Sequence, residues 1–169
     1  MARSFPKDWF NLPQDMLADF GAMMFLAALS KTHNAHSLGQ NFYGFETPLR
    51  LKQYYIFRNR DGYPRGFVTF AGLSPDAEMR FAVEQTALKP EDWCSGSSFW
   101  IVDFIMPFGQ TQKVVDKLKS DLPYNRVRTN RLASDMTTAR IVEWFRRDDQ
   151  SVGLKTYRKG DFAALLGAA

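Results

Sequence analysis

Both histidines of this sequence and one of its 18 carboxylates, that of Asp103, are the side chains best suited to acid–base chemistry. Histidine titrates near neutral pH, so a general base here is His33 or His36 unless a carboxylate with a shifted pKa does the work. Asp103 interrupts an otherwise apolar run from Phe99 to Met106. Because an ionised, unpaired carboxylate is costly to bury, Asp103 requires a partner or a function.

Two interpretations of these residues stay open. Asp103 can be a structural carboxylate that accepts hydrogen bonds from backbone or arginine at a strand end, and a lone histidine is more often exposed or structural. A histidine and an aspartate that meet in space are different, because the carboxylate fixes the imidazole tautomer and stabilises its protonated form. The sequence alone does not show whether they meet.

Two weaker candidates lie nearby. Cys94 is a candidate nucleophile, but no histidine is adjacent to it in sequence. The turn Pro107, Phe108, Gly109 joins an apolar strand to a helix, and amides at a helix N-terminus attract phosphate. The turn has one glycine and lacks the known glycine-rich phosphate motifs, so a phosphopantetheine arm bound there needs most of its contacts elsewhere.

The elements that position these residues follow from periodicity and turn chemistry. Apolar spacing predicts helices over 14–29 and 110–122, and a capping Ser74 followed by proline predicts a helix to about residue 87. Strands are predicted at 52–58 and 65–71 as a hairpin, at 99–106 as a central strand, and at 125–130 and 139–146 around a turn at Ser134 and Asp135, with a terminal helix over 161–166. Residues 30–49 show little periodicity.

Composition bounds the class of protein. The 169 residues, 45% of them hydrophobic, predict one domain over 1–169 with a mixed α/β (α+β) fold and exclude a disordered chain. One cysteine excludes an intrachain disulfide and agrees with a cytoplasmic location. Residues 1–8 do not resemble an export signal, and 16–29 is too short for a transmembrane segment.

The net charge of +4 is concentrated after residue 100, where 12 Lys and Arg face 8 Asp and Glu. The basic residues alternate with apolar residues and form no continuous basic run. This pattern favours ordinary solvent-exposed faces of helices and strands over a surface that binds nucleic acid. Such a surplus also suits docking of an acidic protein.

Residues 91–109 resemble the signature of the RTX toxin-activating lysine acyltransferases, the haemolysin-activator family. They read EDWCSGSSFWIVDFIMPFG, against a family pattern close to EDWxSGDRxWxIDWIAPFG. Residues 59–64 and 70–74 resemble its RDNYP and WAxLS stretches, and Ser30 to His33 lies where the family has SPLH. The similar order and spacing extend over about residues 17–147.

The resemblance implies an acetyltransferase-like (GNAT-like) fold with a mostly antiparallel sheet, no permanently bound cofactor, acyl-acyl carrier protein as the donor and lysines of a protoxin as acceptors. By matching position, His33 and Asp103 correspond to the family's catalytic pair and Ser30 to a serine near its site. Arg126, Arg128, Arg131, Arg146 and Arg147 would steer the acidic carrier. Homodimer formation stays open.

Several residues depart from the family pattern while leaving the pair intact: Asn34, Phe67, Ser97, Ser98 and Phe104. Two rival functions remain at this point. One is a non-catalytic binding module with the acyltransferase shape, and the other is an acyl-CoA-dependent N-acyltransferase of small molecules.

Overall fold

The structure is a computed structural model that describes residues 12–120, 124–132 and 139–167. The predictions about residues 1–8 and about the turn at Ser134 and Asp135 lie outside these ranges. The elements, in chain order, are α1 (Gln14–Ala28), α2 (Leu38–Leu51), β1 (Tyr54–Arg58), β2 (Pro64–Leu73), α3 (Pro75–Glu78), the π-helical turn η2 (Met79–Val83), the 3-10 turn η3 (Pro90–Trp93), β3 (Ser98–Ile105), α4 (Thr111–Ser120), β4 (Arg126–Leu132), β5 (Ala139–Arg146), β6 (Val152–Tyr157) and α5 (Lys159–Gly167).

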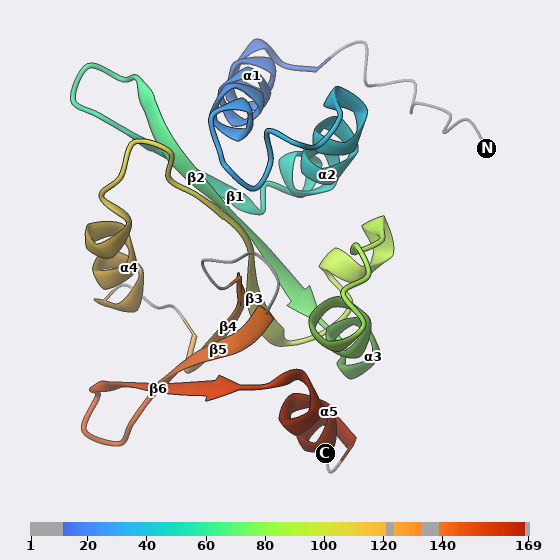
Figure 1. The fold of residues 1–169 in the computed structure, drawn as a ribbon. Helices are drawn as coiled ribbons and strands as arrows, with labels where there is room; N and C mark the ends of the chain where they lie inside the picture. Colours follow the sequence, from blue (N-terminus) through green and yellow to red (C-terminus); the bar gives the residue numbers. More distant parts are fainter. Residues whose placement is uncertain (1–11, 121–123, 133–138, 168–169) are drawn as a thin grey trace.

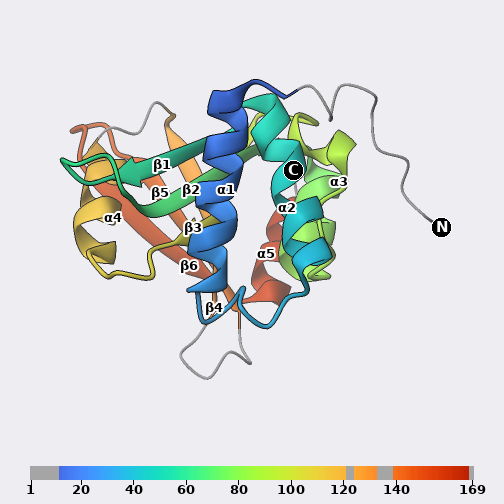
Figure 2. The same cartoon turned by 90° about the horizontal axis from the view of Figure 1, so that it is seen from above.

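The six strands form one sheet in the order β1-β2-β3-β4-β5-β6. Every neighbouring pair is antiparallel except β3 and β4, which run parallel. The mixed α/β class and the mostly antiparallel sheet are therefore confirmed. Figures 1 and 2 show α1, α2, α3 and α5 over one face of the sheet and α4 over the other.

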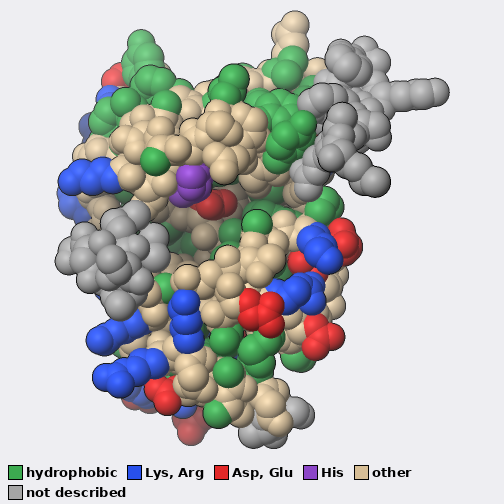
Figure 3. Space-filling view, turned by 45° about the vertical axis from the view of Figure 1, so that its right-hand side comes forward, with side chains coloured by type: hydrophobic (Ala, Val, Ile, Leu, Met, Phe, Trp, Pro, Cys, Tyr) green, Lys and Arg blue, Asp and Glu red, His purple; other side chains and the backbone are tan. Residues whose placement is uncertain are grey.

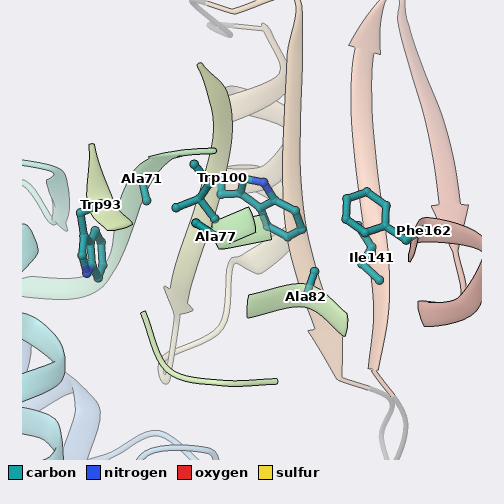
Figure 4. Packing of buried hydrophobic residues seen from close by; sticks show 8 residues of the cluster. Ala71, Ala77, Ala82, Trp93, Trp100, Ile141 and Phe162 are labelled. Atoms are coloured by element: carbon teal, nitrogen blue, oxygen red, sulfur yellow. The ribbon is translucent and has the colours of Figure 1, made fainter. Parts of the chain in front are cut away.

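Three hydrophobic clusters join these layers. Under α1 and α2, Met23 and Phe45 pack on Phe67 and Ile105. Beside α3 and α5, the fully buried Trp100 packs among the residues of Figure 4: Ala71, Ala77, Ala82, Trp93, Ile141 and Phe162. On the opposite face, Val115 and Leu118 of α4 cover a cluster that includes Ile101 and Trp144. These clusters hold β3 on both of its faces.

Several boundaries differ from the predictions. The segment without periodicity contains α2, which a capping box between Ser37 and Gln40 begins. The helix expected to reach residue 87 ends at Val83 after the π-helical turn. Strand β6 was not predicted, because its sequence VGLKTY lacks the alternation of apolar and polar residues that indicates a strand. In the described ranges, no helix is long and apolar enough to cross a bilayer.

A buried ion cluster, defined as Glu78, Arg128 and Glu143, crosses the base of the sheet. Arg128 donates from Nη1 to Glu78 at 2.5 Å and from Nε to Glu143 at 2.8 Å. Trp100 donates its indole N–H to Glu78 at 2.7 Å, and Tyr157 donates its hydroxyl to Glu143 at 3.2 Å. Burial alone would lower the pKa of Arg128, but the hydrogen bonds to Glu143 and Glu78 outweigh it and raise that pKa.

Candidate active site

His33 lies in the loop between α1 and α2, and local hydrogen bonds hold that loop. The amides of His33 and Asn34 both donate to the carbonyl of Ser30, at 3.2 and 2.9 Å. From α2, the buried Asn41 donates its side-chain amide to the carbonyl of His33 at 3.1 Å. The His33 ring lies 5.9 Å from the ring of Phe45. The backbone and ring of His33 are therefore both anchored to α2.

A β-bulge directs Asp103 toward His33. Along β2 and β3, Ala71 pairs with Trp100 and Phe70 with Ile101, but the register then shifts, and Val68 pairs with Phe104. Val102 and Asp103 therefore both lie opposite the single residue Thr69. The extra residue changes the alternation of the strand, so that Asp103 faces the α2 side of the sheet instead of sharing the α4 side with Ile101.

Thr69 completes this bulge. The amide of Asp103 donates to the Thr69 hydroxyl at 3.0 Å, and that hydroxyl donates to Asp103 Oδ2 at 2.6 Å. Thr69 is fully buried, so the carboxylate is held by a fixed side chain. One threonine thus satisfies the bulge amide and orients the carboxylate.

The predicted pair meets. His33 Nε2 lies 3.3 Å from Asp103 Oδ1, and each side chain is 17% exposed. The other ring nitrogen, Nδ1, lies 2.8 Å from the Thr32 hydroxyl, which in turn lies 2.8 Å from the Ser30 hydroxyl. A chain of polar contacts therefore runs from Ser30 through Thr32 and His33 to Asp103 and ends at Thr69.

His33 and Asp103 form part of the walls of two cavities. The first, here called the gap cavity, has a volume of about 470 Å³, and Thr32 and Lys119 also line it. The second, here called the aromatic cavity, has a volume of about 630 Å³ and is lined by Phe81 among other residues. Figure 3 shows a hollow with a histidine and an acidic side chain in its wall. The pair is therefore accessible to ligands.

The gap cavity is named for the gap that opens where β3 and β4 stop pairing. The two strands pair only at Trp100 with Arg128 and at Ile101 with Thr129, although both continue further. Beyond the last pair, residues of both strands line the cavity. The opening thus lies next to Asp103.

Of the remaining predicted residues, only Ser30 is connected to this pair. Ser30 joins it through Thr32, and it shares a smaller cavity of about 360 Å³ with Thr32 and Pro107. Phe108 is 46% exposed, and Gly109 has a positive φ of 84° in the turn before α4. Pro107, Phe108 and Gly109 do not line either cavity that contains His33.

Two other residues with possible chemistry make no contact with Asp103. The ring of His36 lies 5.2 Å from that of His33, and its Nδ1 contacts Asn41 at 3.3 Å. Cys94 is exposed, lines neither cavity and accepts from the Gln53 amide at 3.4 Å. Within the ranges that the structure describes, no group of three or more His, Cys, Asp or Glu side chains is placed to hold a metal ion.

Sequence reasoning missed Thr32 and Thr69. Thr32 precedes the candidate histidine, so its position was a usable signal. Thr69 is 34 residues from Asp103 and sits inside an ordinary strand pattern, so nothing local marks it.

Comparison with known proteins matches residues 12–145 to the RTX toxin acyltransferase family. Over 146 residues the chain is 25% identical to the protein-lysine myristoyltransferase RtxC of Kingella kingae, covering 86% of this chain and 87% of that protein. It is 30% identical over 132 residues to the RTX-III toxin-activating lysine-acyltransferase ApxIIC of Actinobacillus pleuropneumoniae, covering 78% and 75%. A protein-lysine myristoyltransferase HlyC of Escherichia coli is 29% identical over 113 residues, covering 67% and 63%. The family match spans most of the chain, and this acyltransferase therefore belongs to the RTX toxin acyltransferase family.

Proposed function

We propose that this protein transfers a fatty acyl group from an acyl-acyl carrier protein to lysine ε-amines of an RTX protoxin or a related RTX protein in the cytoplasm. The transfer is direct, with no acyl-enzyme intermediate, and uses His33 and Asp103. The observation that carries this proposal is the contact between His33 Nε2 and Asp103 Oδ1 at the wall shared by two cavities. The relatives support the chemistry, since they are named as lysine acyltransferases.

The chemistry requires a base. A lysine ε-amine has an ordinary pKa of about 10.4, so at neutral pH it must lose a proton before it attacks a thioester. His33 accepts the proton released during attack, and Asp103 stabilises the resulting imidazolium. The proximity of Thr69 to Asp103 supports this role, because a carboxylate fixed by a buried hydroxyl holds the imidazole in one orientation.

The gap between β3 and β4 supports a thioester donor on a long arm. A phosphopantetheine arm is narrow and extended, and the gap cavity reaches Asp103 from between the strands. The single parallel pair in an otherwise antiparallel sheet also supports the acetyltransferase-like fold. Pro107, Phe108 and Gly109 precede α4 and remain candidates for contacts with the outer part of the arm.

The aromatic cavity offers a place for the fatty chain. It is lined by Phe45, Phe81, Leu88 and Trp93 and, apart from Asp103, by no charged residue. Moving an apolar chain from water into contact with such side chains is favourable. Two of the relatives are named as myristoyltransferases, which supports a long saturated chain.

The basic surface expected to steer the carrier needs one correction. Arg128 is wrong as a docking residue, because it is buried between Glu78 and Glu143. Arg126, Arg131, Arg146 and Arg147 remain candidates for contact with an acidic carrier. The initial rate at low donor concentration should therefore fall as ionic strength rises, and a rate independent of salt would remove this part of the proposal.

Intact-mass analysis tests the function. A candidate RTX protein is incubated with acyl-acyl carrier protein and enzyme, and the gain of one acyl mass at lysine is followed over time. His33→Ala and Asp103→Asn should remain folded and lose at least about 1,000-fold in rate. Cys94→Ser is the control, because Cys94 is exposed and lines neither cavity, and it should keep near-parental activity if no acyl-enzyme forms.

The same assay separates the rivals. A parent protein that transfers no acyl group to any RTX protein, while still binding it, would support a binding module and contradict the proposal. Turnover of acyl-CoA with free amines in place of carrier and protein would support a small-molecule N-acyltransferase.

A further inference from the structure

The polar contacts of the His33 ring, one with Asp103 and one with Thr32, indicate where its proton lies. An ionised carboxylate only accepts hydrogen bonds, so the contact with Asp103 Oδ1 places the N–H of the neutral ring at Nε2. Nδ1 then carries the lone pair that acts as the base. The Thr32 hydroxyl, 2.8 Å from Nδ1, must be the donor in that contact.

The direction of the bond next in the chain follows. Because the Thr32 hydroxyl uses its one hydrogen on Nδ1, the Ser30 hydroxyl donates to Thr32 Oγ1 across their 2.8 Å contact. The Thr32 amide donates to Ser30 Oγ at 3.3 Å, which holds Ser30 in place. Thr32 Oγ1 keeps one lone pair free to accept a further hydrogen bond.

The basic nitrogen of His33 is therefore occupied by a hydroxyl. A substrate amine that used Nδ1 directly would have to displace Thr32. Thr32 is half-buried and lines the gap cavity together with His33 and Asp103, so a substrate bound in that cavity lies next to it.

We propose that Thr32 is a further catalytic residue, which relays the proton from the attacking amine to His33. This inference rests on the proposed lysine acylation. The lysine first loses one proton to water and attacks as a neutral amine. As its nitrogen bonds to the thioester carbon, an N–H proton passes to Thr32 Oγ1, and the Thr32 hydroxyl proton passes to His33 Nδ1.

The remaining steps restore the enzyme. The carbon–sulfur bond breaks, and the leaving thiolate takes a proton from the imidazolium back through Thr32. The products are the amide and a neutral thiol. Asp103 stays ionised throughout, and Ser30 orients the hydroxyl without exchanging a proton.

Three variants test the relay. Thr32→Val keeps the side-chain shape and removes the hydroxyl, and Thr32→Ser keeps the hydroxyl. Thr156→Val removes an exposed hydroxyl from a residue of β6 that lines neither cavity, and is the matched control. Single-turnover acyl transfer is measured for each with a saturating donor, together with the KM for the donor and the thermal midpoint.

The expected result is a rate loss of at least about 100-fold in Thr32→Val, with the donor KM within about twofold of the parent. Thr32→Ser should recover most of the rate. A Thr32→Val rate equal to or above that of the parent would overturn the relay, and so would equal losses in the serine and valine variants.

A second measurement separates a relay from simple orientation of the ring. In mixtures of H₂O and D₂O, the parent single-turnover rate should fall along a curve with deuterium fraction, because two protons move in one step. A straight line would assign Thr32 to positioning alone and overturn the relay. Absence of acyl transfer by the parent would instead contradict the proposed function, so the two failures are distinguishable.

Discussion

Two carboxylate clusters lie along β3 and are built differently. One lies beside the start of the strand, where Ser98 and Trp100 contact Glu78, and the other is at Asp103 near its end. Near the start, Glu78 and Glu143 share Arg128, and each of these three side chains is 5% exposed or less; we call them the closed cluster. Near the end, Asp103 meets His33 and Thr69 at the wall of two cavities, and we call these three residues the open cluster. The first pairs its carboxylates with a guanidinium that stays charged, whereas the second pairs its carboxylate with an imidazole, a group that can act as acid or base. Only the second can exchange protons with a substrate.

The largest expected effect is on stability at the closed cluster. Arg128→Met leaves two buried carboxylates without their cation, and we expect the free energy of unfolding to fall by about 3–5 kcal/mol, measured by urea denaturation. Acyl transfer per folded molecule should be unchanged.

Arg126 provides the matched control. Its side chain is 61% exposed and approaches Glu143 only at 3.8 Å, so Arg126→Met should cost less than about 1 kcal/mol. If the two methionine variants were equally stable, the closed cluster would not have the structural role assigned to it.

A smaller effect is expected at the open cluster. Thr69→Val removes the hydroxyl that orients Asp103, and we expect kcat to fall about 10-fold, which corresponds to about 1.4 kcal/mol, with little change in KM. Thr69→Ser should restore kcat, because the hydroxyl rather than the methyl group holds the carboxylate. A rise in KM with unchanged kcat would instead place Thr69 in substrate binding.

The smallest effect concerns alkaline pH. Burial, followed by the nearby charge of Glu143, raises the pKa of Tyr157 above its ordinary value of about 10. A raised pKa contributes stability that is fully present below the unfolded pKa and is lost as pH rises through the folded pKa. Tyr157→Phe should therefore lose less stability than the parent above about pH 10, as measured by urea midpoints from neutral to alkaline pH. Identical pH dependence of the two proteins would show that folding does not raise the pKa of Tyr157.

The open cluster was predictable because its key residue breaks a pattern. A single carboxylate within eight apolar strand residues stands out, and the chain has two histidines to pair with it. The side of the sheet that Asp103 faces was not predictable, since strict alternation places it beside Ile101 and only the bulge reverses that. The register of β2 against β3 is a property of tertiary packing.

No pattern in the sequence marks the residues of the closed cluster in this way. Glu78 stands in the first turn of a predicted helix, where an acid is favoured by the helix dipole, so its burial was not suspected. Arg128 lies among other basic residues and was assigned to the surface. Their contact joins residues 50 positions apart, and no local spacing encodes it.

The bulge amide offers a way to observe the site without substrate. In a regular ladder an amide donates to a neighbouring strand's carbonyl, whereas the amide of Asp103 donates to the hydroxyl of Thr69. Its exchange with solvent deuterium therefore depends on a side-chain contact in the middle of an otherwise paired strand. The exchange rate of that single amide reports how often the contact between Asp103 and the Thr69 hydroxyl opens. Turnover measurements do not separate this opening from the chemical step.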